Sequence, residues 1–435
     1  MYQVIKNDNQ ISLKAWRDFV DNHPLGNVFQ LPELFCAYKK IPMFEPIVIV
    51  VKKGDTIVGC LTAIIQKQYK GLLGTITSRA IIQGTPLAYN NDLGIIDILL
   101  KEYLQLVQQK KVIYSQFRNI FEIDFANNVF IRNGFKYDNH LDILIDISIP
   151  IDNIKKKISK SKRGNVSKSL NKKAVFCEIT SKEDYSDCIR LIKKTYQRIG
   201  VPCPRNDYFV TLFNELSNDN ILKIFALKYD NVIIGTRLEL CYKDVVYDWW
   251  AGADNNYKAF YPNDVIPFNI LMWGHNNGYK IFDFGGAGKS NIPYGVRDHK
   301  KKFGGEIVEF GRYEIIHNKF LMFIGKLHFW LYMLVMILAV VTLFMGESTA
   351  KEYAELEWPL DIAVVVVWVL WGVSIFGLIG IRREKTLYIS VWYYIATFLG
   401  VAMLYLFNNM EVPTRLVSGY GSWLHSVSMY AGSND

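Results

Sequence analysis

The sequence VVYDWWAGADNNYKAFYPNDVIPFNILMWGHNNGYKIFDFGGAG, residues 245–288, contains three predicted elements in a row. VVYDWWAGA is rich in β-branched and aromatic residues, which is typical of a strand. PNDVIPFNILMWGHNNG has the length and apolar pattern of a helix that ends at a glycine, and KIFDFGG follows as another strand. The order of these elements indicates an α+β domain.

Upstream, two similar hairpins indicate an internal duplication. IVIVVKKGDTIVGCLTAII (47–65) and LKIFALKYDNVIIGTRLEL (222–240) both consist of strand, turn and strand, and they align Asp55 with Asn231 and Gly59 with Gly235. Predicted helices precede each hairpin, at 12–22 and 31–40 and again at 183–199 and 207–216. We therefore predict two related domains, 1–150 and 151–320, with EIVEFGRYEII (306–316) as the final strand.

The last part of the chain has a different composition. Runs at about 327–345, 360–381 and 387–407 are apolar and each has the ~20 residues that a membrane-spanning helix needs. Arg382, Arg383 and Lys385 follow the second run, whereas the connection after the first run is acidic. The positive-inside rule then predicts three transmembrane helices in 327–435, with residues 1–320 in the cytoplasm and the C-terminus outside.

The N-terminal segment and the cysteines agree with a cytoplasmic location. MYQVIKNDNQISLKAW has no apolar signal-peptide core. The six cysteines form no CxxC pair, so we predict neither a zinc site nor disulfides and assign the chain to a reduced compartment.

Three blocks within residues 1–320 resemble the FemAB-like transferases and related GNAT-type acyltransferases of bacterial envelope pathways. They are HPLGNVFQLPEL (23–34), SKSKRGNVSKSLNKKAV (159–175) and, most specifically, residues 247–288 with HKKKFGG (299–305). The resemblance implies two tandem GNAT-like domains and transfer of an acyl or aminoacyl group to an amine. The paired-helix arm with which some members approach tRNA has no room between Ser159 and Glu178, so aminoacyl-tRNA is the less favoured donor.

The apolar tail resembles another family, the catalytic subunit of cbb-type cytochrome c oxidases. KEYAELEWPLDIA (351–363), RREKTLYISVWYYIAT (382–397) and LFNNMEVP (406–413) carry the similarity. Haem–copper chemistry needs several converging imidazoles, and the histidines of the tail are His328 and His425. We therefore predict no haem. The alternative interpretation is a fragment of an oxidase subunit fused to the transferase without oxidase activity, by natural recombination or by sequence assembly.

Acyl transfer to an amine needs a base and donors for the oxyanion, but no protein nucleophile. Candidate bases on the predicted strands are Glu239, Asp248 and Asp283, each of which can instead be a carboxylate paired with a nearby cation. We favour Asp283 because the glycines of FDFGG allow a ligand to approach the backbone. Arg237, Tyr247 and Trp250, on two of the same strands, are predicted substrate contacts.

Two basic clusters are predicted to bind a phosphate-bearing substrate. Residues 155–173 contain many lysines and no acidic residue, and this run can bind phosphate, attract anionic lipid or be a solvated surface. The resemblance favours phosphate, with Lys162 and Arg163 as contacts. It also places the family's substrate-binding lysine at Lys300.

The predicted function is N-acyl or aminoacyl transfer to a phosphate-bearing envelope precursor or an amino-sugar glycan at the bacterial inner membrane. Donor candidates are acyl-CoA, acyl-carrier protein and charged tRNA. QYKGLLG (68–74) is only a degenerate form of a coenzyme A pyrophosphate loop, and GGAGKS (285–290) lacks the first glycine of a P-loop, so the donor stays open.

Overall fold

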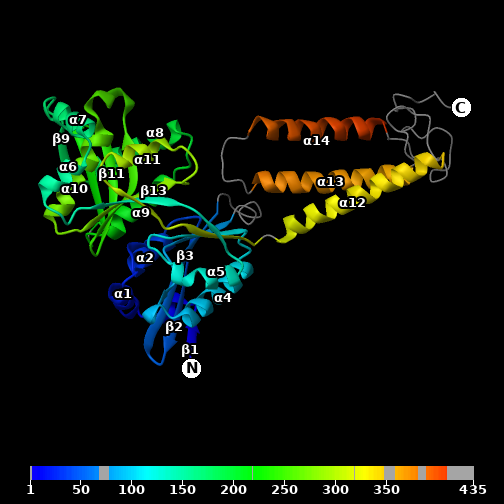
Figure 1. Cartoon of the computed structure of the whole chain (residues 1–435), viewed down its shortest axis with the longest axis horizontal. Coiled ribbons are helices and arrows are strands. Elements are labelled where there is room, and N and C mark those ends of the chain that lie inside the picture. The colour runs from blue at the N-terminus through cyan, green and yellow to red at the C-terminus, as the bar shows by residue number, and fades with distance from the viewer. Residues whose placement is uncertain are drawn as a thin grey trace. The chain divides into compact units, whose positions relative to one another are not determined.

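The computed structural model describes residues 2–67, 78–217, 219–317, 319–346, 358–380 and 388–408. It divides into two compact units, Met1–His317 and Asn318–Asp435 (Figure 1). The first unit contains two mixed β-sheets with helices, as predicted for an α+β fold, and the second unit is helical. The degenerate loop at 68–74 and His425 lie outside the described residues.

The first sheet contains eight strands in the described part of the chain, in the order β1-β2-β3-β4-β6-β15-β7, with β5 paired to β3. Its strands are β1 (Tyr2–Ile5), β2 (Phe44–Lys53), β3 (Thr56–Gln66), β4 (Arg79–Gln83), β5 (Leu87–Ala88), β6 (Tyr114–Arg118), β7 (Lys136–Asp138) and β15 (Arg312–Ile316). Its helices are α1 (Leu13–Asn22), α2 (Pro32–Lys39), α4 (Leu93–Gln109) and α5 (Asn127–Arg132).

The second sheet has the order β14-β8-β13-β12-β11-β10-β9. Its strands are β8 (Leu141–Asp146), β9 (Val175–Glu178), β10 (Leu222–Tyr229), β11 (Val232–Tyr242), β12 (Val245–Ala253), β13 (Ile281–Gly288) and β14 (Glu306–Glu309). Its helices are α6 (Ile151–Lys157), α7 (Lys160–Leu170), α8 (Lys182–Arg198), α9 (Asn206–Leu216), α10 (Pro262–Asn276) and α11 (Gly295–Lys301). The strand–helix–strand prediction for 245–288 thus corresponds to β12, α10 and β13.

The two hairpins, β2 with β3 and β10 with β11, share an irregularity at equivalent positions. In each, the register shifts by one residue just before the aligned glycine, which leaves Val58 and Ile234 as the extra residues. A bulge of this kind increases the local twist of a hairpin. Its repetition supports the duplication.

The aligned glycines are also equivalent in their packing. A Cβ on Gly59 would lie 2.6 Å from Cγ2 of Ile95 on α4, and a Cβ on Gly235 would lie 2.5 Å from Cβ of Pro262 on α10. In both halves, therefore, the second strand of the hairpin lacks a side chain where the long helix crosses it.

The sheets exchange strands, which the predicted division at residue 150 did not anticipate. β8 precedes that boundary but joins the second sheet, and β15 follows it but joins the first sheet. The predicted single strand at 306–316 is therefore wrong: it is two strands in different sheets, separated at Gly311. Gly311 has φ +65°, and a Cβ there would lie 2.2 Å from the Tyr137 ring, so the bend requires glycine.

The chain crosses between the sheets twice, and the two crossings touch. The Gly311 N–H donates a hydrogen bond to the His140 carbonyl at 3.1 Å. A shared apolar core also joins the halves, since Leu34 and Phe35 of α2 belong to the same cluster as Phe209 and Leu212 of α9. Residues 2–317 thus fold as one interlaced unit, with further cores under α4 and α10.

The second unit contains α12 (Lys319–Phe344), α13 (Trp358–Gly380) and α14 (Ile389–Asn408). Within the described residues, Phe323–Phe344 and Pro359–Ile379 are long and apolar enough to cross a membrane, while Ile389–Met403 is a shorter apolar helix. Two of the three predicted spans thus meet the length criterion. The charged connections on which the predicted orientation rests lie outside the described residues.

Candidate active site

The site lies where two parallel strands separate. β12 and β13 pair only over Val245–Tyr247 and Ile281–Asp283, so Tyr247 and Asp283 form the last pair before the strands diverge. Beyond this point β13 pairs irregularly with β8. Separation of two parallel strands leaves backbone groups without a ladder partner, which a side chain or a ligand must satisfy.

Lys300, on α11, fills part of this split. Its ammonium donates hydrogen bonds to the carbonyl oxygens of Phe284, Gly285 and Gly286 at 2.5, 3.1 and 3.1 Å. Burial lowers the pKa of Lys300. An ammonium has three donors, and all three are used here, so Lys300 holds the splayed end of β13 instead of presenting a free cation to a substrate.

Asp283 forms a buried carboxyl pair with Asp142. Both side chains are almost fully buried, and they share a hydrogen bond, which requires a proton between the two carboxyl groups. Burial raises the pKa of Asp142 to about 6, and burial together with the charge of Asp142 raises the pKa of Asp283 well above its usual range. The Gly285 N–H donates to Asp283 Oδ1 at 2.8 Å and fixes its orientation.

The other two predicted bases lie together on the far side of the split. Asp248 forms an ion pair with Arg237, and both side chains are at most 9% exposed. Glu239 is completely buried beside Asp248. Burial and the charge of Asp248 raise the pKa of Glu239 well above its usual range. Asp248 is thus paired with Arg237, and burial favours the neutral form of Glu239.

The remaining predicted contacts are divided between the split and other parts of the unit. Tyr247 is partly buried and packs edge-on against Phe29 with ring centroids 5.0 Å apart. Trp250 belongs to an aromatic cluster with Tyr196 and Phe209.

Lys162 and Arg163 are not brought into the split. Lys162, on α7, is buried in an ion pair with Asp264 of α10, contacts His299 Nδ1 at 2.9 Å and lies over the Phe303 ring. Arg163 is exposed on another side of the same helix. Lys162 therefore joins α7 to α10 and α11, and the exposed part of the basic run is a separate surface.

An apolar cavity of about 260 Å³ opens beside the carboxyl pair, between the two halves. Its wall includes Asn27 and Phe29 from the first half and Tyr242, Tyr247 and Asp283 from the second. It is large enough for a small acyl group or part of an acceptor, and Asp283 and Tyr247 reach it from the split.

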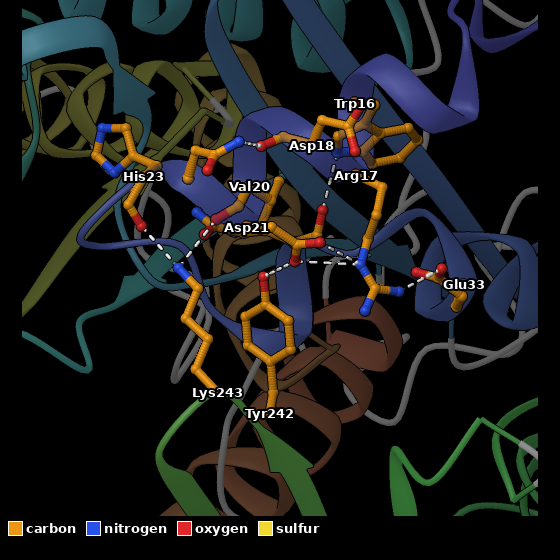
Figure 2. A network of polar contacts seen from close by, with 11 residues as sticks. Trp16, Arg17, Asp18, Val20, Asp21, His23, Glu33, Tyr242 and Lys243 are labelled. Atoms are coloured by element: carbon orange, nitrogen blue, oxygen red, sulfur yellow. Dashed lines mark hydrogen bonds and ion pairs between the residues drawn. The ribbon is translucent and has the colours of Figure 1, made fainter.

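One wall of this cavity is held by the polar network in Figure 2. The Lys243 ammonium, at the turn between β11 and β12, donates to the carbonyl oxygens of Val20 and His23 at 3.0 and 2.7 Å. The Tyr242 hydroxyl donates to Asp21, which also accepts from Arg17. These bonds tie the end of α1 to the second half and fix the cavity across the two domains.

Sequence reasoning missed Asp142 and Lys243. Asp142 lies on β8, whose membership of the second sheet is not visible in the sequence, and its only signal is a carboxylate within the apolar run LDILID. Among the described residues, no three His, Cys, Asp or Glu side chains gather in a way that could hold a metal ion.

Comparison with known proteins divides the chain at the same place as the structure. Residues 155–301 match the family model described as acetyltransferase (GNAT) domain, and residues 315–433 match the model described as cytochrome C and quinol oxidase polypeptide I.

The folded unit of residues 2–317 resembles solved tandem GNAT structures. A crystal structure of FemX aligns with a TM-score of 0.59 and 16% identity, covering 73% of this chain and 98% of that one. A tandem GNAT protein from the clavulanic acid biosynthesis pathway aligns with a TM-score of 0.50 and 10% identity, covering 73% and 98%. At these identities the likeness shows the fold alone.

The tail is similar to curated oxidase subunits. It is 41% identical over 107 residues to the cbb3-type cytochrome c oxidase subunit CcoN1 of Stutzerimonas stutzeri and 39% identical over 112 residues to cytochrome c oxidase subunit 1 of Rhodobacter capsulatus. These matches cover 25% and 26% of this chain, and the chain spans about a fifth of the length of these relatives (21% and 20%).

The chain thus combines a region that matches the acetyltransferase (GNAT) model with an apolar C-terminal segment. More particularly, its first unit has the tandem, FemX-like form of that fold, and its tail matches cytochrome c oxidase subunit I.

Proposed function

We propose that residues 2–317 transfer an acyl or aminoacyl group to an amino group of a cell-envelope precursor or glycan. The observation that carries the proposal is the buried Asp142–Asp283 carboxyl pair at the point where β12 and β13 separate, next to a cavity between the halves. A carboxyl pair that holds one proton can accept a second one, which is the role that an attacking ammonium requires.

In the proposed reaction the acceptor amine attacks the donor carbonyl carbon and forms the new C–N bond. The pair takes the proton that the amine loses, and the bond from the carbonyl carbon to the leaving sulfur or oxygen then breaks. Tyr247, whose hydroxyl lies near Gly285 at the same point, gives its proton to the leaving group and recovers one from the pair. The donor is acyl-CoA, acyl-carrier protein or aminoacyl-tRNA.

Lys300 acts here as a positioning residue. By holding the carbonyl groups of β13 it keeps the strands apart and keeps Asp283 directed to the cavity. A phosphate-bearing envelope precursor or an amino sugar is the proposed acceptor. The inner membrane is the proposed location, with the helices of the second unit as the anchor and the transferase on the cytoplasmic side.

The test uses the full chain purified in detergent and offered acyl-CoA, acyl-carrier protein or charged tRNA with amino-sugar acceptors. Asp142→Asn is expected to lower kcat by roughly 10²–10⁴-fold, the usual range for loss of a general base. Asp146→Asn is the matched control, because Asp146 lies on the same strand but is exposed, and its carboxylate accepts hydrogen bonds from Ser148. Equal activity of the two variants, or no transfer with any donor, would contradict the proposal.

A further inference from the structure

A second cavity, of about 180 Å³, lies at the place where the two crossing segments meet. Its wall includes Arg118, His140, Asp142, Tyr247 and Arg312. Unlike the apolar cavity, it is lined mainly by polar and charged groups, and it shares Tyr247 with that cavity. Through Asp142 it also reaches the carboxyl pair.

The two arginines of this cavity are held by neutral side chains. Neither guanidinium forms an ion pair with a carboxylate in the described part of the chain. Arg118 donates its Nε–H to Gln116 Oε1 at 2.8 Å, and Arg312 donates from Nη2 to His140 Nε2 at 2.7 Å. A guanidinium has five N–H donors, so both retain donors, and both are partly exposed to the cavity.

The surroundings keep both positive charges close together. Burial and the neighbouring charges of Arg312 and Arg79 lower the pKa of Arg118 to about 10, so it is still charged at neutral pH. Burial and the charge of Arg312 lower the pKa of His140 to about 4, which leaves His140 neutral and able to accept from Arg312. Two like charges held beside one cavity repel each other; Glu314 and Asp142 act on Arg312 from the protein side, and an anion in the cavity would lie against both guanidinium groups.

Two hydrogen bonds to backbone carbonyl groups hold the cavity wall. Asn119 Nδ2 donates to the Phe310 carbonyl at 3.0 Å, and the Gly84 N–H donates to the Arg118 carbonyl at 2.7 Å. Gly286 leaves space at the rim, since a Cβ there would lie 3.2 Å from His140 Nε2 and 3.8 Å from Arg312 Nη2. Both guanidinium groups therefore belong to a preformed site and not to a mobile surface.

The duplication relates the position of Arg118 to that of Asp283. In the first sheet the parallel strands β4 and β6 pair up to Gln83 and Arg118, just as β12 and β13 pair up to Tyr247 and Asp283. Arg118 therefore occupies in the first half the place that Asp283 occupies in the second. The point where β12 and β13 separate thus carries the proton acceptor Asp283. The point where β4 and β6 separate carries the cation Arg118.

We propose that Arg118 and Arg312 bind an oxyanion group, a phosphate or a carboxylate, carried by the acceptor substrate. Arginine forks match the geometry of both groups. Bound there, the anion lies next to Asp142, so that an amine on the same molecule reaches the carboxyl pair. This assignment rests on the proposed function for the identity of the acceptor but not for the binding itself.

The test measures binding of inorganic phosphate and of acetate separately to the full chain in detergent, by calorimetry without any acyl donor. Saturable binding is expected, weakened by about tenfold or more in Arg118→Gln and Arg312→Gln, as loss of a charge-assisted bond predicts. Arg190→Gln is the control, because Arg190 is 78% exposed on α8. The anion that binds more tightly identifies the group on the acceptor.

Several outcomes would overturn the assignment: no saturable binding of either anion, unchanged binding in both cavity variants, or equal weakening in Arg190→Gln. Arg312→Lys keeps the charge and removes the fork, so an intermediate loss is expected, and this variant serves if a glutamine variant does not fold. Intact anion binding without any acyl transfer would contradict only the proposed function. In an active enzyme, Arg118→Gln should raise the KM for the acceptor.

Discussion

The hydrogen bond between Asp142 and Asp283 requires one proton on the pair, and burial raises the pKa of Asp142 to about 6 and that of Asp283 well above its usual range. Since the proposed base is the ionised member of the pair, kcat/KM should rise with pH through about 6 and then level off. Asp142→Asn should remove this limb from the pH–rate profile. An unchanged limb in that variant would assign it to another group.

The raised pKa of Asp142 also predicts how the stability of the fold depends on pH. A carboxyl with a raised folded pKa stabilises the fold most below its unfolded pKa of about 4, and this contribution is lost as the pH rises through the folded pKa. Wild-type protein should therefore lose stability between pH 4 and about 6 relative to Asp142→Asn. Urea unfolding at several pH values in that window measures the difference, and parallel curves for the two proteins would contradict it.

Removal of the Lys300 ammonium should destabilise the unit. Lys300→Met leaves three carbonyl oxygens of β13 without their donors, and a buried polar group without a partner costs about 1–3 kcal/mol. Lys301→Met is the matched control, since Lys301 is exposed in the same helix and should change stability by less than about 0.5 kcal/mol. Equal denaturation midpoints for the two variants would exclude the positioning role.

At the scale of elements, the duplicated hairpins predict which glycines resist substitution. Gly235→Ala places a Cβ 2.5 Å from Pro262 and 2.9 Å from Ile266, and such overpacking costs about 1–3 kcal/mol. Gly164→Ala, inside α7 and with no atom near its Cβ position, should instead stabilise by about 0.5–1 kcal/mol. Thermal denaturation of both variants checks the opposite signs.

Elements with a strong local pattern could be predicted from the sequence. The hairpins, the two helices before each of them, and the sequence of β12, α10 and β13 were all found, since each is determined by periodicity and turn residues over a short range. Gly59 and Gly235 were aligned correctly, although their contact with the long helices needed the structure.

What the sequence could not give is long-range placement. No local sequence feature shows that β8 and β15 change sheets. The sequence therefore could not predict that Asp142, Arg118 and Arg312 line one cavity. Charge alone also could not show that Lys162 is buried, because its partner Asp264 lies about a hundred residues further along the chain.

At the scale of the whole molecule, we expect that the tail does not carry out oxidase chemistry. The chain spans about a fifth of its oxidase relatives (21% and 20%), and His328 is the only histidine in the described part of the tail. Haem ligation in such enzymes needs converging imidazoles. We therefore expect no Soret band in the purified full chain. A haem spectrum that is lost in His328→Ala would favour the fused oxidase fragment instead.

The junction between the units predicts how far the transferase depends on the membrane. Because Met1–His317 has its own cores, a chain that ends at His317 should fold with an unchanged melting temperature, while the exposed apolar faces of α12 and α13 disappear with the tail. Membrane fractionation should then find the shortened protein in the soluble fraction.

With a soluble acceptor the kcat/KM of the shortened protein should equal that of the full chain. A lipid-linked acceptor should be used less well, because anchoring no longer raises its local concentration. Equal use of both acceptors by the two proteins would show that the tail is a fusion without a role in the reaction, and sequencing across the junction in source DNA would then establish how it arose.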